Sequence, residues 1–246
     1  MAGHSAWANI KHRKAAQDKR RSKLFTKLVK EIYISVKEGG ADPEGNARLK
    51  MAIRNARKAS VPRDTIDKAI KKGSGTGGDE YEEFTLEGYG PNGVAIFVEV
   101  MTDNSTRAIQ NVRAAFNKYG GALGKNGSVG YLFDRRGVFV FPAEGVDEEA
   151  ITAELLDAGL YDLQREEDSF VATCLFEDYG LLAAKFDGLG IDTENTLERI
   201  PQNYVELDPE RARPVMKMLE ILEDDDDVQN VFHNLELTEE IEAAMG

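Results

Sequence analysis

The sequence predicts an α+β protein of several domains: a basic N-terminal three-helix domain, then two α/β domains, one ferredoxin-like and inserted in the other. Three observations lead to this prediction. The hydrophobic period is helical up to a glycine-rich segment at residues 73–79 and mainly alternating after it. The balance of charge reverses at the same place. Finally, 246 residues are more than one compact core usually holds.

Charge divides the chain into two unlike parts. Residues 1–72 contain 19 Lys and Arg against 7 Asp and Glu, whereas residues 73–246 contain 12 against 37. The overall net charge of −13 therefore conceals a strongly basic N-terminal third. Because a surface of one sign attracts partners of the other, this third is expected to contact a polyanion, and nucleic acid is the first candidate.

The basic part is predicted to contain three amphipathic helices behind a polar arm. Residues 1–22 have little apolar content, so we expect them to be mobile without a partner. Apolar residues recur every four positions over residues 22–39, with lysines on the opposite side, and predict the first helix. A second helix is predicted at residues 46–59, with an inner stripe of Leu49, Ala52, Ile53 and Ala56. The third begins near Pro62 and has Gly73 as its C-cap.

The acidic part alternates strands and helices. Strands are predicted at 84–89, 93–101 and 129–133, with a helix at 105–119. Residues 137–200 then follow the β-α-β-β-α-β order of ferredoxin-like folds: 138–141, 147–158, 160–165, 169–174, 179–189 and 191–199. An extended stretch at 203–207, a helix at 209–222 and a strand at 228–234 return to complete the earlier domain. The predicted boundaries are 1–72, a linker at 73–79, 80–135 with 203–246, and an insertion at 136–202.

The candidate nucleic-acid contacts are the basic residues of the arm and helices, with two aromatic groups that can stack on bases. Between Lys11 and Lys30 there are nine Lys and Arg and a single acid, Asp18. Lys and Arg bind phosphates by releasing condensed counterions, and aromatic rings suit RNA or single strands. The candidate set is Trp7, Lys11, His12, Arg13, Lys14, Lys19, Arg20, Arg21, Lys23, Lys27, Lys30, Arg54, Arg57, Lys58 and Arg63.

Two glycine-rich segments carry weaker signals. Gly73, Gly75 and Gly78 have the spacing of a dinucleotide site, but a helix precedes them and a strand follows, the reverse of what such a site needs. The loop at residues 120–128 lacks the pattern of a phosphate-binding P-loop. It is either a mobile connection or a second contact with a polyanion or partner, because Lys118 and Lys125 are rare bases in the acidic part.

Two polar clusters also have ordinary structural explanations. The acidic run at residues 223–227 could collect a divalent cation, but carboxylates clustered in sequence usually form a solvated loop. The Asp-Asn-Ser-Thr sequence at residues 103–106 more simply caps the helix that follows. A metal-dependent nuclease built on residues 224–227 is therefore the weakest of the functional alternatives.

Catalysis finds little support in the sequence, although the abundant carboxylates leave open a catalytic pair that converges only in the fold. With three histidines and one cysteine there is no evident triad or metal-ligand set, so we expect no enzyme, no catalytic residue, no cofactor and no metal. Cys174 lies in an apolar run and is expected to be buried. No apolar run approaches the roughly 20 residues of a membrane span, and the N-terminus has no secretory pattern. We expect a cytoplasmic protein without membrane contact and, since no dimer seam is evident, a monomer.

The N-terminal sequence AGHSAWANIKHRK at residues 2–14 resembles the signature of the YebC/PmpR family. Further matching segments are FTKL at 25–28, NARL at 46–49, VPRDTI at 61–66, AIKKG at 69–73, EGYGP at 87–91, TDN at 102–104 with Arg107, and GSVGYLF at 127–133. Ala6 stands where this family usually has Lys, which removes one possible phosphate contact.

The resemblance implies a helical N-terminal domain followed by two α/β domains, and it implies two competing functions. Family members are described as probable transcriptional regulators that bind DNA. Mitochondrial relatives are translational activators of cytochrome c oxidase, and bacterial members are linked to ribosomes stalled at proline-rich stretches. Our leading hypothesis is a ribosome-associated translation factor that contacts ribosomal RNA through residues 1–72. The alternative is a DNA-binding transcriptional regulator.

Overall fold

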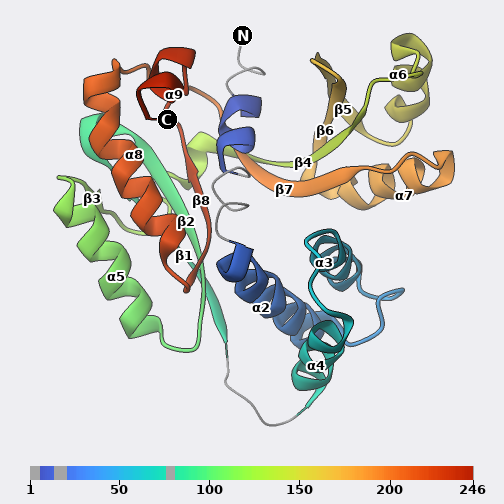
Figure 1. Ribbon diagram of the computed structural model, residues 1–246, viewed down its shortest axis with the longest axis horizontal. Helices are drawn as coiled ribbons and strands as arrows, with labels where there is room; N and C mark the ends of the chain where they lie inside the picture. The colour runs from blue at the N-terminus through green and yellow to red at the C-terminus, as the bar shows by residue number, and fades with distance from the viewer. Residues whose placement is uncertain (1–5, 14–20, 76–80, 246) are drawn as a thin grey trace. The chain divides into compact units, whose positions relative to one another are not determined.

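The computed structural model describes residues 6–13, 21–75 and 81–245. The chain divides into two compact units, one of residues 131–202 and the other of residues 2–130 with 203–246 (Figure 1). A helical N-terminal region and two antiparallel four-stranded sheets give the mixed architecture expected of a multidomain α+β protein. Within the described ranges, no helix combines the length and apolar character that spanning a membrane requires.

Three helices of the N-terminal region share one core: α2 (Arg21–Gly39), α3 (Ala47–Lys58) and α4 (Arg63–Ser74). The side chain of Asn46 caps α3, because its Oδ1 accepts the N–H of Leu49 at 3.0 Å. Its Nδ2 donates to the carbonyl oxygens of Ser35 at 2.7 Å and Gly40 at 2.8 Å, which fixes the turn after α2. The stripe that α3 buries is the predicted one: Leu49, Ala52, Ile53 and Ala56.

Helix α2 is covered on more than one side, which the sequence pattern did not predict. Residues 32–36 are all buried. Ile32 and Val36 face the three-helix core, whereas Tyr33 and Ile34 pack with Met101 of strand β2 (Ala95–Thr102). The prediction of one apolar side and one solvated side is therefore wrong over this stretch, because strand β2 covers the second side.

Gly73 is not the C-cap of α4, since the helix continues to Ser74 and is capped at Gly75. A Cβ atom at Gly73 would lie 2.7 Å from the carbonyl oxygen of Tyr33 and 2.8 Å from Cβ of Val36. Glycine is needed here because α4 and α2 approach each other closely, not because the helix ends.

Part of the arm predicted to be mobile is ordered. Residues 6–13 form a helix in which Ile10 is buried and Ala8 packs against the core of the first sheet. Nδ2 of Asn9 donates to the carbonyl oxygens of His233 at 3.4 Å and Leu235 at 3.1 Å. These partners lie 224 and 226 residues further along the chain, so local composition gave no indication of them.

The first sheet has the strand order β3-β1-β2-β8 and is antiparallel throughout. Its other strands are β1 (Glu82–Tyr89), β3 (Ala122–Leu123) and β8 (Val228–His233). Helices α5 (Ser105–Lys118) and α8 (Pro209–Asp224) share a core with β2 and β8. A last helix that we did not predict, α9 (Glu239–Met245), adds Ile241 to this core. Because α8 and β8 follow residue 202, this layer is discontinuous in sequence.

The unit of residues 131–202 has the order β-α-β-β-α-β. Its elements are β4 (Phe133–Pro142), α6 (Glu148–Leu156), β5 (Leu160–Glu166), β6 (Ser169–Leu175), α7 (Tyr179–Leu189) and β7 (Glu194–Pro201). The antiparallel sheet has the order β5-β6-β4-β7. Cys174 is buried in its core as expected, and burial raises the pKa of its thiol to about 11.

The predicted strand at residues 129–133 is wrong. A short 3-10 helix, η2 (Gly130–Leu132), occupies most of it, and β4 begins only at Phe133. The backbone N–H groups of Val129 and Gly130 donate to the carboxylate of Glu87 at 2.8 and 2.7 Å. Because these donors are committed to a side chain, they do not take part in a strand ladder.

Candidate nucleic-acid interface

The predicted contact residues are spread over three described segments. Helix 6–13 carries the first of them, α2 the next, and α3 with the start of α4 the rest. Lys14, Lys19 and Arg20 lie outside the described residues, as does the side chain of Arg21.

Most of the predicted contact residues on helix 6–13 are partly covered by the rest of the protein. Lys11 is exposed, whereas Trp7, His12 and Arg13 are half-buried. The guanidinium carbon of Arg13 lies 4.8 Å from the ring centroid of Phe232, a cation–π distance. On this helix, Lys11 is the predicted contact with the most open position.

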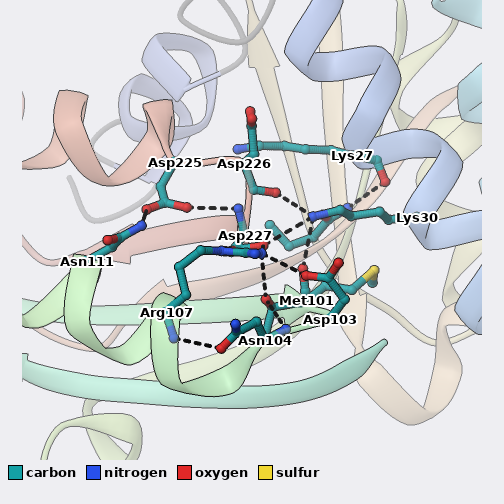
Figure 2. Close-up of polar contacts among 12 residues, drawn as sticks. Lys27, Lys30, Met101, Asp103, Asn104, Arg107, Asn111, Asp225, Asp226 and Asp227 are labelled. Carbon is teal, nitrogen blue, oxygen red and sulfur yellow. Dashed lines mark hydrogen bonds and ion pairs between the residues drawn. The ribbon is translucent and has the colours of Figure 1, made fainter. Parts of the chain in front are cut away.

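Three predicted contacts on α2 reach one acidic segment at the end of α8, and Figure 2 shows two of them, Lys27 and Lys30. We call residues 223–227, Glu-Asp-Asp-Asp-Asp, the acidic turn. Nζ of Lys23 lies 2.9 Å from a carboxylate oxygen of Asp224. Nζ of Lys27 donates to the carbonyl oxygen of Glu223 at 3.1 Å. In this arrangement both lysines bind within the protein rather than facing outward.

The ammonium group of Lys30 contacts both the acidic turn and strand β2. Its Nζ donates to the carbonyl oxygens of Asp226 at 2.7 Å and Met101 at 3.2 Å, and lies 3.5 Å from a carboxylate oxygen of Asp227. Lys27 and Lys30 are only 6% and 8% exposed. As placed here, neither ammonium group is open to a phosphate.

The acidic turn is only in part the solvated loop that we predicted, because Asp224 and Asp226 are exposed but Asp227 is not. Asp227 is 3% exposed, and Arg107 donates to its two carboxylate oxygens from Nε and Nη2, both at 2.8 Å (Figure 2). Nη2 of Arg107 also donates to Asp103 at 2.7 Å. Sequence reasoning missed this pair, although Arg107 stood among the family-like residues. The predicted helix cap is confirmed: Asn104 caps α5 by accepting the N–H of Arg107 at 3.0 Å.

Cations hold Asp227 in its ionised form. Burial by itself would raise the pKa of this carboxyl group, but hydrogen bonds from Arg107 and Thr102 and the charges of Lys30 and Arg107 outweigh it, so the pKa lies below its ordinary value. Throughout the described residues, no three His, Cys, Asp or Glu side chains are grouped so that they could hold a metal ion. At this turn the carboxylate of Asp227 is paired with Arg107 and Lys30.

The predicted contacts on α3 and α4 are the most accessible. Arg57, Lys58 and Arg63 are exposed on either side of the α3–α4 turn, while Arg54 is half-buried. The side chain of Arg63 is 90% exposed, and its ion pair with Asp67 is long, at 3.7 Å. By contrast, Arg48 on α3 is engaged by Glu31 at 2.8 Å and by Glu38 and Glu83. Arg48 therefore serves structure rather than contact.

The glycine-rich loop at residues 120–128 is held in place rather than loosely connected. The carboxylate of Glu87 on β1 is 6% exposed and accepts the N–H groups of Gly127, Val129 and Gly130 at 2.7–2.8 Å. Gly124 donates its N–H to the carbonyl oxygen of Glu87 at 2.8 Å. Lys118 and Lys125 are exposed, so a second polyanion contact stays a prediction.

His233 on β8 lies beneath helix 6–13 and is kept neutral. Its Nδ1 is buried with no hydrogen-bond partner among the described residues. Burial first, and then the nearby charges of His12 and Arg13, lower its pKa to about 3. A protonated imidazole at this position would therefore oppose docking of the helix.

We expect the stability that His233 contributes to be lost as the pH falls from about 6.5 toward 3. In this range the unfolded imidazole takes up a proton and the folded one does not, so acidification favours unfolding by up to about 1.4 kcal/mol per pH unit. Between pH 7 and about pH 5 the wild type should lose about 2 kcal/mol through this group. His233→Gln should lose correspondingly less when urea unfolding is measured at both pH values. Equal losses in the two proteins would contradict the assignment.

The comparisons with known proteins agree over nearly the whole chain. Residues 5–76 match the family description TACO1/YebC protein N-terminal domain, and residues 81–235 match TACO1/YebC second and third domain. A probable transcriptional regulatory protein of Idiomarina loihiensis is 49% identical, covering 100% of this chain and 99% of that protein. One of Syntrophotalea carbinolica is 48% identical over 98% of this chain and 97% of the relative.

A solved structure is also similar to nearly the whole chain. The crystal structure of a conserved hypothetical protein from Aquifex aeolicus superposes with a TM-score of 0.81 at 39% identity, covering 92% of this chain and 94% of the other. Sequence identity at this level over the full length, two matching family descriptions and a shared fold agree with one another. The chain belongs to the TACO1/YebC family.

Proposed function

We propose that this protein is a nucleic-acid-binding regulatory protein that makes its contact through the three N-terminal helices, without catalysis of its own. The observation that carries the proposal is the exposed basic edge at the α3–α4 turn, made of Arg57, Lys58 and Arg63. This edge belongs to residues 1–72, which contain 19 basic residues and 7 acidic ones. Lys11 on helix 6–13 adds a further exposed base. Such a surface gains free energy by displacing counterions from phosphates.

We further propose ribosomal RNA as the target and the ribosome as the partner. The remainder of the chain has 37 acids against 12 bases. An acidic body repels bare nucleic acid and complements basic ribosomal proteins, so the two parts together would orient a monomer on a mixed surface. In this proposal residues 1–72 are the RNA-binding domain, and residues 136–202 are a ferredoxin-like insertion in the acidic α+β domain.

Duplex DNA is the second candidate, and the names of the relatives favour it. Both relatives described above are called probable transcriptional regulatory proteins. A three-helix region can place one helix in the major groove. The two candidates differ in what competes for the protein: ribosomes in one case and a specific duplex sequence in the other.

A charge-reversal variant tests the interface. Arg57→Glu, Lys58→Glu and Arg63→Glu together should weaken ribosome binding by at least about tenfold, since each removes one phosphate contact and adds a repulsion. Sedimentation with ribosomes over a salt series, with promoter-length duplex DNA as competitor, provides the measurement. The matched control reverses three exposed bases on α5 and α8, namely Arg113, Arg213 and Lys217.

The outcomes separate the candidates. Saturable ribosome binding that survives excess DNA, fails in the interface variant and persists in the control supports the translation factor. Binding that duplex DNA removes, together with a sequence-specific footprint, supports the transcriptional regulator. Equal loss of binding in the interface variant and the control would show that only total charge matters and would overturn the interface.

A further inference from the structure

The acidic turn has a shape that does not depend on the lysines of α2. A carboxylate oxygen of Asp225 accepts the N–H of Asp227 at 2.8 Å, and the other accepts Nδ2 of Asn111 at 2.9 Å. The N–H of Met101 donates to the carbonyl oxygen of Asp227 at 2.9 Å. The turn is therefore fixed by α5, β2 and its own backbone, and it presents a preformed set of acceptors.

The lysines of α2 bind where negative charge is concentrated. Glu223 and Asp224 end helix α8, so their carbonyl oxygens lie at the negative end of its dipole. Lys23, Lys27 and Lys30 are spaced four and three residues apart and therefore share one side of α2. Acidic side chains and helix-end carbonyls together give this lysine row a closely spaced series of negative groups, as a phosphate backbone also does.

The contact between the lysines of α2 and the acidic turn can break at a modest cost in free energy. Asp227 would keep its two hydrogen bonds from Arg107 if α2 moved away, so no bare buried carboxylate would be left. The side chains of Asp224 and Asp226 are 52% and 68% exposed and already in contact with water. Ion pairs of such exposed groups contribute little individually. Apolar support for this side of α2 comes from the small cluster of Tyr33, Ile34, Met101 and Tyr81.

We infer that the lysine side of α2 is a second RNA-binding surface, which the acidic turn occupies in competition with the RNA strand. The inference rests on the proposed function and extends it to a named surface and a mode of control. RNA binds first through the exposed edge at the α3–α4 turn. Release of α2 from the acidic turn then adds Lys23, Lys27 and Lys30 to the phosphate contacts, so the turn lowers affinity for short or weakly bound strands.

Neutralising the exposed carboxylates of the turn tests this inference. Asp224→Asn with Asp226→Asn leaves Asp225 and Asp227, which shape the turn, unchanged. A labelled oligouridylate should bind this variant about three- to tenfold more tightly than the wild type, as expected from two lost exposed ion pairs. Between about 50 and 200 mM salt, the slope of log K against log salt should steepen by about 2, since three lysines gain phosphates. The control is Glu240→Gln with Glu242→Gln, the same loss of charge at exposed positions of α9.

A double-mutant comparison separates displacement from a general charge effect. Lys23→Gln with Lys27→Gln should change oligouridylate affinity little in the wild type, where the acidic turn occupies both side chains. In the Asp224→Asn, Asp226→Asn background, the same lysine changes should abolish the gain in affinity. Such non-additivity is the mark of coupled groups. Thermal melting of each variant establishes that it is folded.

The outcomes distinguish this inference from the proposed function. If oligouridylate binds and the edge variant of Arg57, Lys58 and Arg63 loses binding, but the turn variant behaves like its α9 control, the inference is overturned and the proposed function stands. Additive effects in the double-mutant comparison overturn it equally. A gain seen only with duplex DNA overturns the choice of RNA. Failure of every variant to bind nucleic acid or ribosomes overturns both proposals.

Discussion

Glu87→Ala should be among the most destabilising single substitutions in the first sheet, lowering stability by about 3–4 kcal/mol. The side chain is buried and accepts three backbone N–H groups from the loop after β3. Hydrogen bonds to a charged acceptor contribute about 1.5–3 kcal/mol each, and a buried donor that loses its partner keeps the cost of its lost hydration. Water can reach Gly127, which is exposed, but not the buried N–H of Val129.

The expected readout is a fall in Tm of roughly 6–16 °C, together with faster hydrogen exchange at Val129 and Gly130. Glu82→Ala is the matched control, because Glu82 lies on the same strand and is exposed. The fall in Tm for Glu87→Gln should lie between those of Glu87→Ala and Glu82→Ala. An amide keeps one acceptor oxygen, but its NH2 group points toward the backbone N–H donors. If Glu87→Ala destabilises the protein no more than Glu82→Ala, the loop does not depend on this carboxylate.

Asp227→Asn should have a comparable effect, with a loss of about 3 kcal/mol. It removes the countercharge of Lys30, whose side chain is only 10% exposed, and weakens the paired hydrogen bonds from Arg107. Breaking a buried ion pair costs about 3–5 kcal/mol, and the lower end applies because the Arg107 side chain is 47% exposed and can return to water. Asp226→Asn, one residue earlier and exposed, should change stability by less than about 0.5 kcal/mol.

Two further measurements test whether the ion pair between Asp227 and Lys30 causes the loss of stability in Asp227→Asn. Adding Lys30→Met to Asp227→Asn should restore part of the loss, because the buried ammonium group then no longer lacks its countercharge. The pKa of Asp227 is lowered in the folded protein, so its contribution is complete above the ordinary carboxyl pKa and is lost as the pH falls through the folded value. The difference between the wild type and Asp227→Asn should therefore narrow in acid. A difference that is independent of both Lys30 and pH would rule out the ion pair as its source.

The elements that the sequence predicted well are those whose signals are local. The stripe of α3 follows from helical spacing alone, and Asn46 and Asn104 cap their helices through backbone groups three residues away. The strand and helix order of residues 131–202 could likewise be read from alternation and turn residues. Helix 6–13 could not, because its support comes from β8 at the far end of the chain.

The candidate site divides in the same way. The sequence by itself determined that the N-terminal third is basic and the remainder acidic, and that three helices would carry the basic residues. Only the tertiary structure decided which of those bases face outward, since Lys27 and Lys30 are buried against the acidic turn while Arg57, Lys58 and Arg63 stay exposed. The physical reason is that charge and helical period act over a few residues, whereas the partner of a long lysine side chain depends on segments nearly 200 residues apart being folded together.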